Sequence, residues 1–128
     1  MNSAMCPYDN IRIICADWLS SYAKKSVDFI FSNPPYIPIG DNNVENSVES
    51  NEPASALFSG VDGLDDIRKI ISFSKDTLSY SGILFLENGI GQSSKITSML
   101  KLNDFTDIKV HMDYNNKERF TSSRKNYG

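Results

Sequence analysis

Apolar segments of two different periods alternate along this sequence, and their order restricts the folds that the chain can adopt. Residues 11–15, 27–31 and 83–86 are continuous apolar and β-branched runs, a pattern that is typical of buried strands. Residues 106–112 alternate apolar and polar side chains, as a half-buried strand does, and a last short strand is expected near residues 119–122. The chain therefore contains several strands, and the segments between them decide the class of fold.

Two amphipathic helices are expected between these strands. Apolar residues from Leu64 to Leu78 keep to one helical face, with aspartates at the amino-terminal end and Gly82 as a stop. A shorter helix with a serine cap is expected over residues 93–103. The order strand, strand, helix, strand, helix, hairpin predicts an α/β fold, in the form of the latter part of an α/β sheet.

The composition fits a single globular domain and excludes several functional classes. The length of 128 residues allows one domain, and the net charge is −3 with scattered lysines and arginines, so no nucleic-acid-binding surface is expected. No apolar run approaches the roughly 20 residues of a membrane helix. Because no export signal is recognisable either, we expect a cytoplasmic protein that does not bind membranes. The spacing of Cys6, Cys15 and His111 fits no metal site.

The sharpest candidate for a functional site is the motif Asn33-Pro34-Pro35-Tyr36 (the NPPY motif), which directly follows the strand at residues 27–31. In open α/β sheets, ligands bind at the carboxyl ends of strands. The Asn33 oxygen and the Pro34 carbonyl can accept both N–H bonds of a planar amide or exocyclic amine, and the prolines offer no competing donor. The Tyr36 ring can lie against such a group. The motif therefore predicts alkylation of a planar nitrogen without an ionised base.

A purely structural interpretation of this motif is also open, in which two prolines end a strand and Tyr36 packs against its neighbours. Residues 36–60 then follow without a periodic pattern and are rich in Asn, Ser, Glu, Gly and Pro. A stretch of this length is usually a functional or mobile loop. We expect a substrate loop here, with residues 37–59 as a lid that becomes ordered over the substrate.

Further motifs follow the NPPY motif in a fixed order. They are the continuation Ile37-Pro38, then Glu52-Pro53 and Ala56-Leu57, then Asp62-Gly63-Leu64 with Arg68 and Ile70-Ile71, and finally Leu86-Glu87 with Gly89 and Gln92. In this combination the sequence resembles the class I methyltransferases that use S-adenosylmethionine, and among them the HemK/PrmC-type peptide chain release factor glutamine methyltransferases. The resemblance extends from about residue 11 to about residue 124. It implies a Rossmann-like methyltransferase sheet, S-adenosylmethionine as cofactor and a peptide chain release factor as protein substrate.

The resemblance also implies roles for the residues of the NPPY motif. Asn33 would contact both the cofactor and the target amide, and Pro34, Pro35 and Tyr36 would line the slot for the target. These four residues are therefore the expected catalytic residues.

Asp17 and Trp18 are the second candidate site. They follow the strand expected at residues 11–15, where the family contacts the adenine of the cofactor, so the resemblance implies that they bind S-adenosylmethionine together with Asn33. From the residues alone, Asp17 could instead cap a helix and Trp18 could belong to the core.

Other charged residues are weaker candidates. Glu49 and Glu52 could form a catalytic pair, but two acids in a polar loop are more often solvated. Glu87 is expected to make a structural hydrogen bond rather than to face a pocket. Arg119 and Arg124 either contact the release factor or remain solvated.

Two features that the family uses to bind its cofactor are not found in this sequence. These are the Gly-rich turn after a first strand and the acid that ends a second strand. Residues 1–128 therefore resemble the carboxyl-terminal part of a methyltransferase catalytic domain, without its first strands. In the implied strand order, 3-2-1-4-5-7-6, residues 11–15 form strand three and residues 27–31 form strand four. Both would lack a native neighbour, so we expect a homodimer, an exchange of elements, or pairing of these two strands.

The implied reaction transfers a methyl group from S-adenosylmethionine to the side-chain amide nitrogen of the glutamine in the Gly-Gly-Gln loop of a release factor. The Ile37-Pro38 continuation favours release factors over a ribosomal protein as substrate. This chain alone is expected neither to bind the cofactor tightly nor to methylate. Two alternatives stay open. One is an adenine-specific DNA methyltransferase, which the acidic charge disfavours, and the other is a non-catalytic fragment that binds a partner protein.

Overall fold

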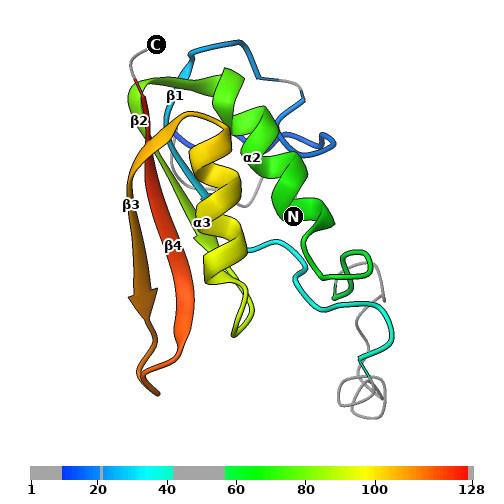
Figure 1. The fold of residues 1–128 in the computed structure, drawn as a ribbon. Helices are drawn as coiled ribbons and strands as arrows, with labels where there is room; N and C mark the ends of the chain where they lie inside the picture. Colours follow the sequence, from blue (N-terminus) through cyan, green and yellow to red (C-terminus); the bar gives the residue numbers. More distant parts are fainter. Residues whose placement is uncertain (1–9, 21, 42–56, 127–128) are drawn as a thin grey trace.

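The fold is a mixed β-sheet with two helices packed on one of its faces (Figure 1). The computed structural model describes residues 10–20, 22–41 and 57–126. Within these residues the strands are β1 (Val27–Ser32), β2 (Leu78–Glu87), β3 (Phe105–Met112) and β4 (Glu118–Lys125), and the helices are α2 (Asp65–Thr77) and α3 (Ser93–Leu102). None of the described helices is long and apolar enough to cross a membrane.

The strands lie side by side in the order β1-β2-β4-β3. β1 and β2 are parallel, whereas β4 runs antiparallel to both β2 and β3. This order equals the last four strands of the order that the family resemblance implies, and the predicted α/β class is confirmed. Because β1 and β2 are parallel, their carboxyl ends meet at one edge of the sheet. The NPPY motif follows β1 at this edge, and Asn88 follows β2.

The core lies between the sheet and the two helices. Alternate residues of β2 are buried, and Leu84 lies beside Ile30 of β1 in the parallel register. The helices meet this surface with apolar residues at helical spacing, since a helix buries one stripe of its surface. These buried residues are Ile67, Ile70 and Ile71 of α2 and Ile96 and Leu100 of α3.

The boundary between α2 and β2 differs from the sequence prediction. Apolar spacing placed Leu78 on the helix and Gly82 at its stop, but α2 ends at Thr77 and β2 begins with Leu78. Leu78 pairs with Val27 of β1 and has extended backbone dihedrals, φ −65° and ψ 137°. Leu78 is buried, as the last turn of a helix or the first residue of a strand can be. The apolar pattern therefore could not distinguish these two states.

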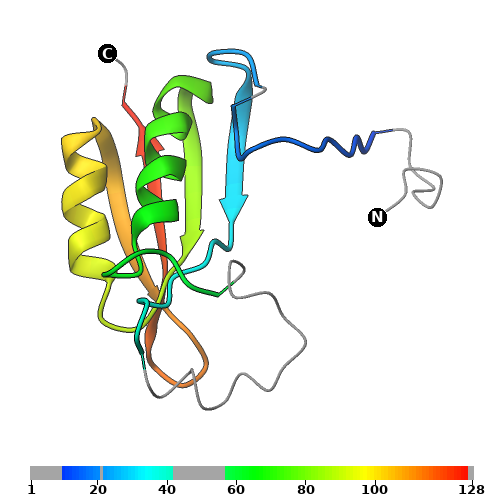
Figure 2. The same ribbon diagram turned by 90° about the vertical axis from the view of Figure 1, so that its right-hand side faces the viewer.

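The strand expected at residues 11–15 is not formed, and that prediction was wrong. Ile11, Ile13 and Ile14 are 51%, 46% and 55% exposed, and the segment makes no β-ladder with β1 or with any other described strand. Figure 2 shows that β1 is an edge strand and that the chain before it forms no strand alongside it. β-branched residues form a strand only where a neighbouring strand takes up their backbone hydrogen bonds. The association expected from the free edge of β1 stays a prediction.

The face of the sheet opposite the helices carries exposed aromatic rings. Phe29 and Phe31 of β1 are 54% and 60% exposed. Phe31 stacks on Phe85 of β2 at 5.5 Å between ring centroids, and Phe85 in turn lies 5.7 Å from Phe120 of β4. Within the described residues, this face therefore carries a row of rings that no helix covers (Figure 1).

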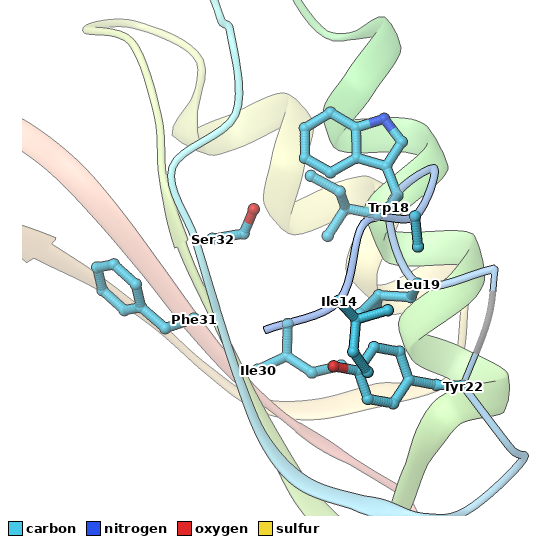
Figure 3. Close-up of a pocket in the computed structure, with 9 residues that line it drawn as sticks. Ile14, Trp18, Leu19, Tyr22, Ile30, Phe31 and Ser32 are labelled. Atoms are coloured by element: carbon cyan, nitrogen blue, oxygen red, sulfur yellow. The ribbon is translucent and has the colours of Figure 1, made fainter. Parts of the chain in front are cut away.

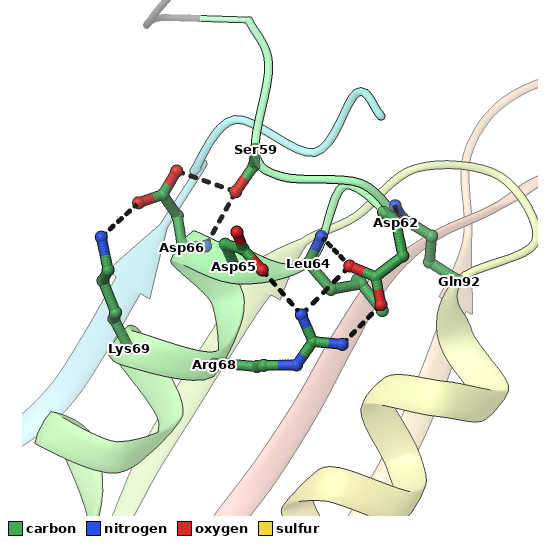
Figure 4. A network of polar contacts seen from close by, with 8 residues as sticks. All are labelled: Ser59, Asp62, Leu64, Asp65, Asp66, Arg68, Lys69 and Gln92. Carbon is green, nitrogen blue, oxygen red and sulfur yellow. Dashed lines mark hydrogen bonds and ion pairs between the residues drawn. The ribbon is translucent and has the colours of Figure 1, made fainter. Parts of the chain in front are cut away.

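The start of α2 is held by side chains from the preceding turn (Figure 4). The Ser59 hydroxyl accepts a hydrogen bond from the Asp66 amide at 2.8 Å, as an N-cap side chain does. The Asp62 carboxylate accepts the Leu64 amide at 3.1 Å and the Arg68 guanidinium at 3.0 Å. The hydrogen bond from Arg68 is the largest cause that lowers the pKa of Asp62 from 3.8 to about 2. Asp62 and Asp66, two of the aspartates that predicted the start of this helix, therefore make hydrogen bonds that hold its first turn.

We predict that Asp62→Asn lowers the thermal unfolding midpoint at neutral pH and that this difference disappears below a pH of about 2. The folded pKa of Asp62, about 2, lies below its ordinary value of 3.8, so the ion pair stabilises the fold fully above pH 3.8. This stabilisation is lost as the pH falls through about 2. Thermal unfolding across this range measures it. In an Arg68→Met background, Asp62→Asn should have a smaller pH-dependent effect, since only the Leu64 amide and the charge of Lys95 then lower the pKa of Asp62, and an unchanged pH dependence there would exclude the ion pair as the main cause.

Candidate active site

The NPPY motif leaves the sheet at the carboxyl end of β1. Pro34 is fully buried, Pro35 and Tyr36 are half-buried, and Asn33 is exposed. Asn33 is therefore accessible to a ligand, while the buried Pro34 anchors the motif to the fold.

The hydroxyl of Tyr36 is held by two charged residues. Arg119 donates a hydrogen bond to this hydroxyl at 2.7 Å, and the hydroxyl donates to Glu87 at 3.2 Å. Arg119 also pairs with Glu87 at 3.2 Å, and its guanidinium lies 5.4 Å from the centre of the Tyr36 ring. Burial raises the pKa of Tyr36 above its ordinary value, Arg119 lowers it and Glu87 raises it, with a net upward shift. The phenol is therefore neutral at physiological pH.

The carbonyl of Tyr36 is held by the side chain of Gln92. The Gln92 amide nitrogen donates to the Tyr36 carbonyl at 2.8 Å and lies 3.3 Å from the Asp62 carbonyl. Its oxygen accepts the Gly89 amide at 2.8 Å. One side-chain amide thus connects the NPPY motif, the turn before α2 and the turn after β2.

Two glycines allow these segments to approach one another. A Cβ atom on Gly63, which has a φ of +75°, would lie 2.3 Å from the Tyr36 carbonyl oxygen. A Cβ atom on Gly89 would lie 2.9 Å from the Gln92 side-chain oxygen and 3.1 Å from the Tyr36 ring. A side chain at Gly63 would collide with the backbone of the motif, so this position needs glycine, whereas a side chain at Gly89 would make the Tyr36 ring and the Gln92 side chain shift. Residues from three separate sequence motifs therefore pack around Tyr36.

The loop after the NPPY motif is paired at its two ends. The Ile37 amide donates to the Leu57 carbonyl at 3.2 Å, and the Ser59 amide donates to the Ile37 carbonyl at 2.9 Å. These contacts form one isolated bridge between Ile37 and Phe58, and no helix or strand is formed in the described parts of residues 36–60. Residues 42–56, which include Glu49 and Glu52, lie outside the described residues. The lid stays a prediction.

A cleft of about 370 Å³ opens beside Tyr36. It is lined by Tyr36, Arg119 and Gln92, by Asp41 and by the turn after β2, residues 89–91. Asn33, Pro34 and Pro35 do not line it. Of the residues predicted to form the target slot, the structure places only Tyr36 in this cleft.

Trp18 lines a second cleft, of about 250 Å³, which shares no lining residue with the cleft beside Tyr36 (Figure 3). Trp18, Leu19 and Ile14 face Ile30 of β1 there, and Ser32 lies at its border. Asp17 is exposed and does not line this cleft. Trp18 is also packed against the apolar core. Its position is therefore compatible both with a core residue and with a residue that lines a ligand cleft.

Sequence reasoning did not predict the contact of Arg119 with the NPPY motif. Arg119 lies 83 residues from Tyr36 in sequence. The implied strand order held a signal for it, because the strand that begins near Arg119 lies beside the strand that ends at Glu87. Arg124, at the other end of β4, instead pairs with Asp107 at 3.3 Å. It is far along the strand from the candidate site.

Curated relatives match most of the chain. A protein named release factor glutamine methyltransferase from Francisella tularensis is 42% identical over 118 residues, which are 92% of this chain and 42% of that protein. Proteins of the same name from Escherichia coli and Salmonella typhimurium are 35% and 32% identical over 115 residues. Over this span, the chain is similar to the release factor glutamine methyltransferases. It spans less than half the length of these relatives. No protein-family model matches the chain.

Solved structures share the fold. The Mtq2-Trm112 complex of E. cuniculi, described as responsible for methylation of the eRF1 translation termination factor, matches with a TM-score of 0.57 at 20% identity. The match covers 88% of this chain and 60% of that chain. A protein described as a DNA modification methylase from Thermus thermophilus, complexed with S-adenosyl-L-methionine, matches with a TM-score of 0.57 at 16% identity, over 86% and 50% of the chains. Identities this low show the fold alone, which is that of a methyltransferase.

We predict that Gly63→Ala destabilises the fold by at least about 1 kcal/mol more than Gly91→Ala. Both glycines have positive φ, +75° and +83°, so both variants carry the same kind of backbone strain. Only the Gly63 variant also collides with the Tyr36 carbonyl, because nothing lies within 4 Å of a Cβ at Gly91. Urea unfolding of the two variants measures the difference. Equal losses of stability would show that the close approach at Gly63 does not matter.

Proposed function

We propose that this chain is the carboxyl-terminal part of the catalytic domain of a cytoplasmic methyltransferase. The enzyme transfers a methyl group from S-adenosylmethionine to the side-chain amide nitrogen of a glutamine in a peptide chain release factor. The observation that carries this proposal is the packing of three motif-bearing segments around Tyr36, the last residue of the motif that begins with the exposed Asn33. The family of the curated relatives supports the choice of substrate.

In this proposal the residues of the NPPY motif catalyse the transfer by holding the target amide in position. The Asn33 side-chain oxygen and the Pro34 carbonyl accept the two N–H bonds of the target amide, and neither proline offers an N–H that competes. The Tyr36 ring, fixed at its hydroxyl and its carbonyl, lies against the plane of the amide. The amide nitrogen would form a bond to the methyl carbon as the bond from that carbon to the sulfonium sulfur breaks, with its electron pair left on the sulfur, and the nitrogen would lose one proton to solvent. Alignment of reacting groups can lower a barrier by several kcal/mol, about 7 to 11 in favourable cases.

The cofactor supplies an electrophilic methyl group on a sulfonium. The Trp18 cleft suits the flat ring of adenine, because its walls are mainly apolar, with Ile14, Trp18, Leu19 and Ile30. Within the described residues, no charged side chain lines this cleft. The residues present therefore fit the adenine end of the cofactor, and they offer no partner there for its charged methionine end.

Adenine methylation in DNA is the second candidate function. The likeness to the DNA modification methylase supports it at the level of fold. The net charge of −3 disfavours it, because proteins that bind DNA neutralise phosphates with lysine and arginine. The relatives that match by sequence carry the name of the release factor enzyme, so we favour the protein substrate.

We predict that Asn33→Ala reduces methyl transfer at least about tenfold, since one well-aligned hydrogen bond is worth at least about 1.4 kcal/mol. The assay uses this chain joined to the preceding part of the Francisella tularensis relative, with a release factor as substrate and mass spectrometry of its glutamine peptide. Asn126→Ala, at an exposed asparagine beyond β4, is the control. Retention of more than about a tenth of the wild-type rate by Asn33→Ala would contradict the role of Asn33.

We also predict that the 128-residue chain alone binds S-adenosylmethionine with a dissociation constant well above about 10 µM. The reason is that the Trp18 cleft offers apolar contacts and no charged partner. Calorimetric titration measures the constant. A value at or below about 10 µM would show that the chain forms a complete cofactor site by itself.

A further inference from the structure

Glu87 and Arg119 lie outside the NPPY motif, on two different strands, yet both bind the hydroxyl of Tyr36. We propose that these two residues are positioning residues of the methyl transfer, because they fix the Tyr36 ring in the one orientation that places it against the target amide. This inference rests on the proposed function and deepens it.

The contacts leave the Tyr36 side chain little freedom. Its hydroxyl accepts from Arg119 at 2.7 Å and donates to Glu87 at 3.2 Å, so one of its lone pairs and its proton are both engaged. The Arg119 guanidinium also lies 5.4 Å from the ring centre, within the range of a cation–π contact. Gln92 holds the carbonyl of the same residue at 2.8 Å. Movement of the whole side chain would break both hydrogen bonds at the hydroxyl, and rotation of the ring about its own axis, which leaves the hydroxyl oxygen in place, would change the contact of Arg119 with its face.

The backbone at the start of β4 is fixed as well. The Asn88 amide donates to the Arg119 carbonyl at 2.8 Å, and the Thr121 hydroxyl donates to the buried Asn88 side chain at 3.0 Å. The Arg119 side chain thus reaches Tyr36 from a hydrogen-bonded strand rather than from a loop. Rigid elements position a side chain more accurately than loops do.

Arg119 holds this position although one of its own donors is not satisfied. Its Nε atom is buried and has no hydrogen-bond partner. A buried donor without a partner destabilises a fold. A buried donor of this kind calls for an explanation, and a functional role of Arg119 is one such explanation.

The first test titrates Tyr36 in this chain without any assay of activity. The pH dependence of tyrosine absorbance is measured for the wild type and for Tyr36→Phe, and the difference isolates Tyr36. Glu87→Gln should lower its pKa and Arg119→Met should raise it, because Glu87 disfavours the phenolate and Arg119 favours it. Asp41 and Asp62, which line the same cleft, are unchanged in both variants. Arg124→Met, on the same strand, is the control and should have no effect. Shifts of the same sign in both variants, or none, would overturn the proposed contacts.

The second test measures transfer kinetics in the joined protein described above. Arg119→Met should lower kcat at least about tenfold and change KM for the release factor less than about threefold. Arg119→Lys keeps a donor and should retain more activity than Arg119→Met. In a Tyr36→Phe background, Arg119→Met should lower kcat by less than about twofold, because the residue acts through the hydroxyl. If Tyr36→Phe and Arg119→Met instead lower kcat by independent factors that multiply in the double variant, the positioning role is overturned.

The two tests separate this inference from the proposed function. If the wild-type joined protein methylates no release factor, the proposed function fails, and the positioning role in methyl transfer fails with it. The titration then still decides whether Glu87 and Arg119 hold Tyr36. If the wild type is active and Arg119→Met and Glu87→Gln retain its kcat, only the positioning role is wrong.

Discussion

The side-chain amide of Gln92 is the contact on which the geometry of the candidate site depends. It donates to the Tyr36 carbonyl at 2.8 Å and accepts the Gly89 amide at 2.8 Å. A glutamine can do both because its side chain carries a donor and an acceptor a short distance apart. The segments it joins leave β1 and β2, which are parallel neighbours, so the sheet itself brings them to one edge. Glycines at positions 63 and 89 then allow the close approach.

The two faces of the sheet have different roles in this account. The helical face holds the core and is complete within the described residues, with Leu84, Leu86 and the α2 isoleucines fully buried. The opposite face carries stacked and exposed rings, and β1 pairs on one side alone among the described strands. The NPPY motif lies at the end of the sheet where β1 and β2 finish. The cleft beside Tyr36 is fixed by many contacts, whereas the separate Trp18 cleft is bordered by residues 14–20, which form no helix or strand.

Much of the fold could be predicted from the sequence, and the failures have physical causes. β2 was recognisable as a continuous apolar run, and β3, α2 and α3 were recognisable because each has a clear period. Residues 11–15 have the composition of a strand, but a strand also needs a neighbour, which composition does not reveal. Leu78 was assigned to the wrong element because burial suits both a helix end and a strand start. The NPPY motif could be found because its four residues are adjacent. Its support by Gln92 and Arg119 was not predicted, because these residues lie 56 and 83 positions from Tyr36, and only the implied strand order brought Arg119 near this edge.

The central claim is that the exposed Asn33 and the fixed Tyr36 together hold the side-chain amide of a release factor glutamine. The most direct measurement is a crystal structure of the joined protein with a release factor fragment that contains the Gly-Gly-Gln loop. The account predicts that the glutamine amide nitrogen lies within hydrogen-bond distance of the Asn33 side-chain oxygen and the Pro34 carbonyl, with its plane against the Tyr36 ring. A glutamine bound away from Asn33, or a Tyr36 ring turned away from the amide, would contradict it.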